Sequence, residues 1–257
     1  MINPMRPRFL TLAAAALLAG CGAESSVSPT TPVSLDEVFK EMRLPALSGV
    51  TSRSARFGGP STALGSTVPK GCSYALASQS FVCAPITEGN LTITQSYQLL
   101  NSSGGPLPAF EATSLAAVRM QGTATGTQTN AAGTITLDGR QDQTLSGLQT
   151  SKHVLNGTST LNVSGTYGAD TLAEPFTETI KTTTSDLVIP ANPGPNTYPA
   201  SGTITIDETS VFPGVPLPPS RIVITFNGTS KVTVTIGGVS IPGCSTIDLS
   251  STSPGCS

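Results

Sequence analysis

The chain has 257 residues, with 13 lysines and arginines against 15 aspartates and glutamates, and its formal net charge at pH 7 is −2. Only 11% of the residues are charged, and the positive charges form no basic stripe for phosphates, so nucleic acid is excluded as an expected partner. The length suits one large β-domain or two small ones with a substantial core.

The first residues have the composition of an export signal. Arg6 and Arg8 precede an apolar run from Phe9 to Ala19. A transmembrane helix needs about 20 apolar residues, so this run is too short to span a bilayer and has the length of a signal-peptide core. We therefore expect residues 1–20 to be a signal peptide that is removed on export.

The run ends in Leu18-Ala19-Gly20-Cys21, which resembles the lipobox of bacterial lipoproteins, a cleavage and lipidation site whose last residue is cysteine. The resemblance covers the leader and the first mature residue. It implies cleavage before Cys21 and covalent lipid on the Cys21 thiol and on its new amino group, and no other cofactor is expected. Such acylation anchors a protein stably to a membrane. In the same family, a residue other than aspartate directly after the cysteine indicates the outer membrane. Gly22 at this position therefore implies the outer membrane.

Residues 21–33 are mostly small and polar and include two prolines, which predicts a lipidated flexible tether. The next segment, residues 34–44, is expected to be an amphipathic helix. Ser34 and Glu37 have the spacing of a capping box, and apolar residues recur at helical spacing: Leu35, Val38, Phe39 and Met42. Acidic residues on the opposite face favour docking of this helix on the β-domain over a position on the membrane surface. Residues 45–70 are rich in serine, glycine and proline and predict an irregular segment.

Four cysteines remain once Cys21 carries lipid, and they allow three connectivities. We favour disulfides between Cys72 and Cys83 and between Cys244 and Cys256, because each pair closes a loop of about a dozen residues. A zinc site is not expected, since the spacings contain no CxxC element and the chain has 1 histidine.

From residue 71 to residue 257 the sequence predicts an antiparallel β-domain. Apolar residues alternate with polar ones, mostly threonine, in a series of runs: Leu91 to Tyr97, Thr134 to Leu137, Thr203 to Ile206, Arg221 to Phe226 and Lys231 to Ile236. Asn227-Gly228, between two of these runs, predicts a hairpin with a type I′ turn. The residues between Cys72 and Cys83 predict another short hairpin. The fold class is therefore all-β, a large antiparallel sheet with long hairpins, and the alternation is compatible with a curved sheet, a sandwich or a barrel.

An internal repeat is expected over about residues 133–163 and 202–234. The sequence that begins with Gly133-Thr134-Ile135 recurs from Gly202, and Asn156-Gly157-Thr158-Ser159 recurs from Asn227. In this alignment His153 corresponds to Ile224, which predicts that His153 faces the apolar side of its strand.

Motifs that carry enzymatic chemistry are absent from the sequence. It has no G-x-S-x-G, S-x-x-K or H-E-x-x-H motif and no Walker-type loop. A Ser-His-Asp arrangement would depend on His153, for which a structural role is favoured. Acidic pairs at equivalent strand ends could ligate calcium, but aspartate at turns is the preferred interpretation: Asp138 with Asp142, and Asp207 with Glu208. No catalytic residue and no metal site are therefore predicted.

These observations predict a lipid-anchored envelope protein of the outer membrane whose β-domain has a non-enzymatic binding or structural role, with an envelope protein as a possible partner. The alternative is a carrier or sensor that holds an apolar ligand or lipid in the cavity of a curved sheet, similar to large periplasmic half-barrels. A hydrolase is the least favoured interpretation.

Overall fold

The computed structural model describes residues 71–130, 133–167, 174–191, 198–212, 215–237 and 245–249. The expected signal peptide (1–20), tether (21–33), helix (34–44) and irregular segment (45–70) lie outside these residues, as do Cys21, Cys244 and Cys256. In the part of the chain that the structure describes, no helix is long and apolar enough to cross a membrane.

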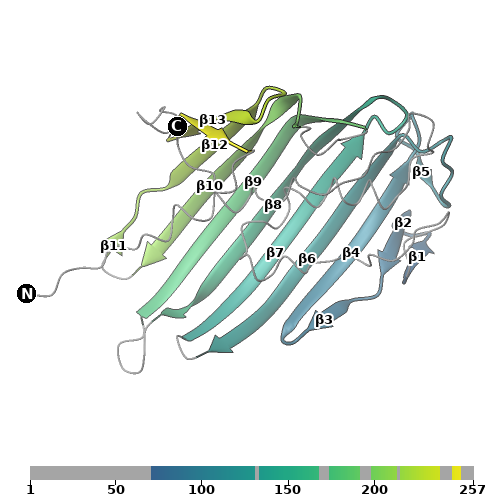
Figure 1. Cartoon of the computed structure of the whole chain (residues 1–257). Coiled ribbons are helices and arrows are strands. Elements are labelled where there is room, and N and C mark those ends of the chain that lie inside the picture. Colours follow the sequence, from purple (N-terminus) through teal and green to yellow (C-terminus); the bar gives the residue numbers. More distant parts are fainter. Residues whose placement is uncertain are drawn as a thin grey trace, which may run out of the picture.

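The predicted fold class is confirmed: the described residues are all-β and form one large antiparallel sheet (Figure 1). The strands are β1 (Cys72–Ala75), β2 (Ser80–Cys83), β3 (Ile86–Glu88), β4 (Leu91–Leu100), β5 (Pro106–Leu107), β6 (Ala117–Asn130), β7 (Gly133–Ser146), β8 (Lys152–Tyr167), β9 (Glu174–Pro190), β10 (Ser201–Phe212), β11 (Val215–Pro216), β12 (Ser220–Phe226), β13 (Lys231–Ile236) and β14 (Thr246–Asp248).

The order of the strands shows which of the three compatible architectures the chain adopts. Hydrogen-bonded neighbours follow the order β1-β2-β4-β6-β7-β8-β9-β10-β12-β13-β14, with β3 and β5 paired to β4 and β11 paired to β10. β1 and β14 stand at opposite ends of this order, so the sheet is not closed into a barrel (Figure 1). Because consecutive strands are joined as hairpins, this topology needs no crossover connection.

The two faces of the sheet differ in composition because side chains alternate along each strand. One face carries many threonines, and their hydroxyls pair across neighbouring strands at 2.7 Å between Thr94 and Thr123 and at 3.1 Å between Thr127 and Thr136. We call it the threonine face. The opposite face carries leucine, isoleucine, valine and phenylalanine, and we call it the apolar face. β-branched threonine suits extended backbone, and its hydroxyl keeps the first face polar.

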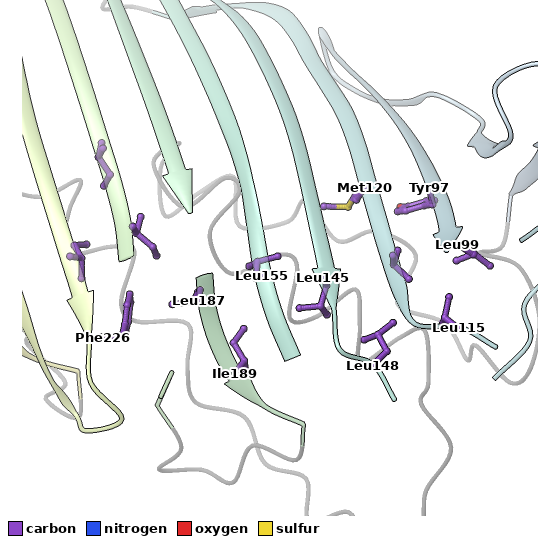
Figure 2. Close-up of a cluster of buried hydrophobic side chains, with 14 of the residues drawn as sticks. Tyr97, Leu99, Leu115, Met120, Leu145, Leu148, Leu155, Leu187, Ile189 and Phe226 are labelled. Carbon is purple, nitrogen blue, oxygen red and sulfur yellow. The ribbon is translucent and has the colours of Figure 1, made fainter. Parts of the chain in front are cut away.

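The core lies at one end of the apolar face. Figure 2 shows buried side chains gathered near the strand ends, from Tyr97 and Leu99 on β4 to Phe226 on β12. Leu115 and Leu148, which lie in the connections that flank β6 and β7, are 0% and 2% exposed and pack against the same cluster. The connections at this end therefore cover the apolar side chains that the strands present.

A β-bulge in β9 keeps the apolar side chains on one face. Before the bulge the even-numbered residues of β9 lie on the apolar face, and after it the odd-numbered Leu187 and Ile189 do. Asp186 in the bulge has a φ of 48°, and its backbone N–H donates to Asn156 Oδ1 at 2.7 Å. On the neighbouring strand β10, a Cβ at Gly202 would lie 2.4 Å from the Asp186 carbonyl oxygen, so glycine is required at position 202. The extra residue reverses the alternation of the strand.

The predicted type I′ turn at Asn227-Gly228 is wrong. The loop has four residues, 227–230, between β12 and β13, and of the first two only Gly228 has a positive φ, of 81°. Asn227 instead accepts hydrogen bonds at its Oδ1 from the Thr229 N–H at 3.1 Å and from the Thr229 hydroxyl at 2.8 Å. The side chain thus organises a longer loop, as asparagine often does in turns.

The two segments of the proposed repeat are alike in one part and different in another. Gly133 begins the run of β7 and Gly202 lies at the start of β10, and both runs place isoleucine on the apolar face. Asn156-Gly157, however, lies inside β8, whereas Asn227-Gly228 lies in a loop. The second sequence match therefore does not correspond to a repeated structural element.

Candidate functional site

The end of the apolar face away from the core cluster is covered less completely. Its side chains on β7, β8 and β9 are half-buried rather than buried, and we call them the outer patch: Ile135, Leu137, Leu161, Val163, Phe176 and Ile180. Phe176 stacks on Phe212 of β10, with ring centroids 5.7 Å apart, and Phe212 is 37% exposed. Apolar side chains that remain half-exposed over several neighbouring strands are typical of a binding surface.

Polar side chains cross the apolar face between the core cluster and the outer patch, and we call them the polar belt: Gln95, Gln141, Gln143, Ser159, Thr182 and Thr184. The strand register brings them together, since Gln141 is opposite Ser159 and Ser159 is opposite Thr182. Gln143 and Thr184 are only 2% and 3% exposed. A band of hydrogen-bonding groups thus interrupts an otherwise apolar surface.

Two glycines provide the space for the glutamine side chains. Gly157 is opposite Gln143, and a Cβ at Gly157 would lie 2.9 Å from the Gln143 Cγ. Gly122 is opposite Gln141, and a Cβ there would lie 3.2 Å from the Gln141 Nε2. Larger residues on the neighbouring strands would therefore displace both glutamines.

The carbonyl oxygens of two belt glutamines lack a hydrogen-bond donor among the described residues. The Oε1 atoms of Gln141 and Gln143 are both buried and unpaired there, whereas Gln95 Oε1 accepts from the Tyr97 hydroxyl at 2.9 Å. A buried acceptor without a partner costs about 1–3 kcal/mol. Buried polar groups in folded proteins are rarely left in this condition, so a hydrogen-bond donor placed beside these two atoms would be stabilised.

A pair of carboxyl groups lies within the outer patch. Glu178 and Glu208, on neighbouring strands, hydrogen-bond to each other, and the Ser210 hydroxyl donates to Glu208 Oε1 at 3.3 Å. Burial, the charge of Glu208 and the hydrogen bond to Glu208 together raise the pKa of Glu178 to about 7, and burial makes the largest contribution. The pair therefore shares a proton at mildly acidic pH.

Charged residues are segregated between the two faces. The lysines and arginines of the described strands all alternate onto the threonine face: Arg119, Arg140, Lys152, Lys181, Arg221 and Lys231. The Arg119 guanidinium donates to Asp142 at 2.8 Å, and this hydrogen bond lowers the pKa of Asp142 and raises that of Arg119. The apolar face carries Glu174, Glu178 and Glu208. A ligand on the apolar face would therefore meet no lysine or arginine from these strands.

The residues singled out in the sequence lie in separate places. Cys72 and Cys83 form the predicted disulfide, directly opposite each other in the β1–β2 hairpin. His153 lies on the apolar face as predicted and is 6% exposed. In the strand register, His153 is opposite Ile189 of β9, and the next residue, Val154, is opposite Ser146 of β7. None of these residues is an aspartate.

The acidic pairs considered for calcium are not brought together. Asp207 and Glu208 are consecutive in β10 and point to opposite faces, and Asp207 lies 3.6 Å from Arg221. Asp138 and Asp142 lie on the threonine face, where Asp142 binds Arg119. Among the described residues, no group of three His, Cys, Asp or Glu side chains could hold a metal ion.

Sequence reasoning did not single out the polar belt or the carboxyl pair. Gln141 and Gln143 are odd-numbered residues of β7, as Leu137 and Leu145 are. The alternation of the strand alone therefore places both glutamines on the apolar face. Glu178 likewise lies between Phe176 and Ile180 on β9, so the alternation places it on the apolar face as well. The signal was therefore a polar residue at an apolar position, which the abundance of threonine in this chain conceals.

A scan of protein-family models, a search of curated proteins and a search of solved structures find no match to this chain.

Proposed function

We propose that the chain is a lipid-anchored protein of the outer membrane whose sheet binds an amphiphilic or apolar ligand on its apolar face, without catalysing a reaction. The anchor is proposed from the resemblance of residues 18–21 to a lipobox. The absence of motifs for acyl transfer, metal hydrolysis or phosphate binding from the sequence supports a non-enzymatic role.

The observation that carries the proposal is that buried apolar, polar and half-exposed apolar side chains follow one another along the same face of the sheet. Along the same strands, the buried core cluster is followed by the polar belt, and the polar belt is followed by the half-exposed outer patch. A surface that joins apolar side chains to a few well-placed polar groups is typical of a site for a small molecule. An envelope protein that covers the outer patch is the second candidate, since exposed apolar patches also mark protein interfaces.

The test is native mass spectrometry of the chain from Gly22 to Ser257, which omits Cys21 and its lipid, exported with an unrelated signal peptide and purified from periplasm without detergent. We expect a reproducible non-covalent adduct of small-molecule mass that is lost on denaturation. Leu161→Glu should reduce the bound fraction about tenfold, because it places a charge in the outer patch.

The matched control is Thr160→Glu, the same substitution one residue away on the threonine face, which should keep the adduct. Thermal melts of both variants establish that they are folded. A clean apo mass for the wild-type chain, or an adduct that survives Leu161→Glu, would contradict the proposed binding face. A clean apo mass together with co-purification of a stoichiometric protein would favour the protein-partner interpretation.

A further inference from the structure

The polar belt contains two acceptor atoms that the described residues leave unused. Gln141 Oε1 and Gln143 Oε1 are buried, and neither has a hydrogen-bond partner there. Gln143 is 2% exposed, so bulk water cannot readily replace the missing donor. These oxygens therefore specify the chemistry of a group that could bind beside them: it must donate hydrogen bonds.

The spacing of the two glutamines indicates more than one donor. They are two residues apart on β7 and point to the same face, which separates their backbones by about 7 Å. Gly122 and Gly157 on the neighbouring strands accommodate the two glutamine side chains, since a Cβ at either position would crowd the glutamine opposite it. A group with hydroxyls on adjacent carbons could reach both oxygens.

The charges on the apolar face restrict the ligand further. The strands place their lysines and arginines on the threonine face, and the apolar face carries Glu174, Glu178 and Glu208. A phosphate or carboxylate headgroup would find no lysine or arginine of these strands on this face to balance its charge. An ammonium group would lose its hydration at the neutral, buried carbonyl of Gln143. An uncharged headgroup avoids both costs.

We propose that the polar belt binds the uncharged, hydroxyl-bearing headgroup of an amphiphile, with Gln141 and Gln143 as its hydrogen-bond acceptors and the outer patch in contact with its hydrocarbon chain. This inference rests on the proposed function and identifies the class of ligand. The belt borders the outer patch directly, because Ser159 precedes Leu161 and Thr182 follows Ile180 on the same face. A chain that lies on Leu161 and Ile180 thus has its polar end at the glutamines.

The experiment is a competition between two probes with the same hydrocarbon chain, monoolein and oleate, which differ in headgroup charge and hydroxyls. The chain from Gly22 to Ser257 is mixed at pH 8 with equal concentrations of both probes, below the concentrations at which they aggregate, and native mass spectrometry measures the two adducts. We expect monoolein to be preferred about tenfold or more, which corresponds to one or two additional hydrogen bonds. Gln141→Met with Gln143→Met should reduce that preference to about threefold or less.

The matched control is Gln128→Met, which replaces an exposed glutamine on the same face of β6 and should leave the preference unchanged. The double variant should melt at the same or a higher temperature, because it removes unpaired buried acceptors, so loss of preference cannot be attributed to unfolding. Equal binding of both probes by the wild-type chain, or an unchanged preference in the double variant, would overturn the headgroup assignment alone and would mean that the two oxygens bind ordered water. If neither probe binds the wild-type chain, the proposed function itself is overturned.

Discussion

Single residues at the outer patch have unusual electrostatics for a surface this apolar. Glu178 and Glu208 share a hydrogen bond between β9 and β10, and burial together with Glu208 raises the pKa of Glu178 to about 7 from a usual value of 4.5. Val163 and Ile180 flank the pair in the register, and neither provides a counter-charge. The carboxyl of Glu178 is therefore retained at an energetic cost, which is more common at functional positions than elsewhere.

The protein should lose stability as the pH rises through this range. Between pH 4.5 and about 7 the folded state keeps a proton on Glu178 that the unfolded state has released, so the free energy of unfolding falls with increasing pH. Glu178→Gln should remove this dependence and raise the free energy of unfolding by about 1 kcal/mol at pH 8, a value reduced because the group is only half-buried. Urea titrations at pH 4.5, 6 and 8 measure the effect.

Glu174→Gln is the matched control for that series, since Glu174 lies on the same face of β9 and is exposed. It should leave the pH dependence of unfolding as it is in the wild-type chain. A wild-type protein whose stability is constant from pH 4.5 to 8 would contradict the assigned role of the carboxyl pair.

Among the elements, the β1–β2 hairpin is the least supported by packing. Its strands have four residues each, and β1 has a neighbour on one side only, β2, in the described sheet. Phe81 is 1% exposed, belongs to the core cluster and is opposite Tyr97 of β4, and this attaches the hairpin to the core. Within the hairpin, the rings of Tyr74 and Phe81 make an edge-to-face contact with centroids 5.2 Å apart. The Cys72–Cys83 disulfide lies at its open end and closes the loop covalently. Such a bridge protects an edge strand from fraying.

Replacement of both cysteines by serine, Cys72→Ser with Cys83→Ser, should lower the free energy of unfolding by about 3 kcal/mol. The reason is that the unfolded chain gains conformational entropy when the disulfide no longer closes a loop of about a dozen residues. The effect on structure should be local, with faster amide exchange in β1 and β2 than in β7 and β8. Chemical denaturation and hydrogen exchange measure the two effects. Equal protection of β1 in the variant and in the wild-type chain would show that packing alone holds the hairpin.

At the scale of the whole molecule, the described residues form one open sheet whose edge strands are β1 and β14. β1 and β14 are far apart in the strand order, and the longest strands, β8 and β9 with 16 and 17 residues, lie in the middle (Figure 1). The threonine face is mostly polar and suits solvent, whereas the apolar face must be covered by chain, ligand or partner. The proposed lipid on Cys21 would hold such a domain close to the membrane from which an amphiphile could come.

The anchor makes a separate prediction about the location of the whole protein. Cys21→Ser should abolish incorporation of labelled palmitate and remove the chain from the outer-membrane fraction, because the acylated residue is lost. The Cys72→Ser, Cys83→Ser variant is the control and should keep both properties. Labelled palmitate on a Cys21→Ser chain would contradict the lipobox assignment.

Much of the fold could be predicted because alternation is a local property. Leu91 to Tyr97 and Lys231 to Ile236 are strands, and the Cys72–Cys83 hairpin forms as expected. The face of His153 was also correctly predicted, since each side chain of a strand points to one of two sides. The type I′ turn was not, because Asn227 uses its side chain to build a longer loop.

The sequence by itself determined the class of the fold, the polar and apolar faces of individual strands and the resemblance to an export and lipidation signal. Tertiary structure decided that the sheet stays open, that a bulge at Asp186 reverses the alternation of β9, and that Gln141, Ser159 and Thr182 become neighbours. The physical reason is that a period of two residues is set within each strand, whereas closure, register and cross-strand contacts depend on hydrogen bonds between distant segments. The candidate site consists of such contacts, and it therefore emerges only when the strands are aligned.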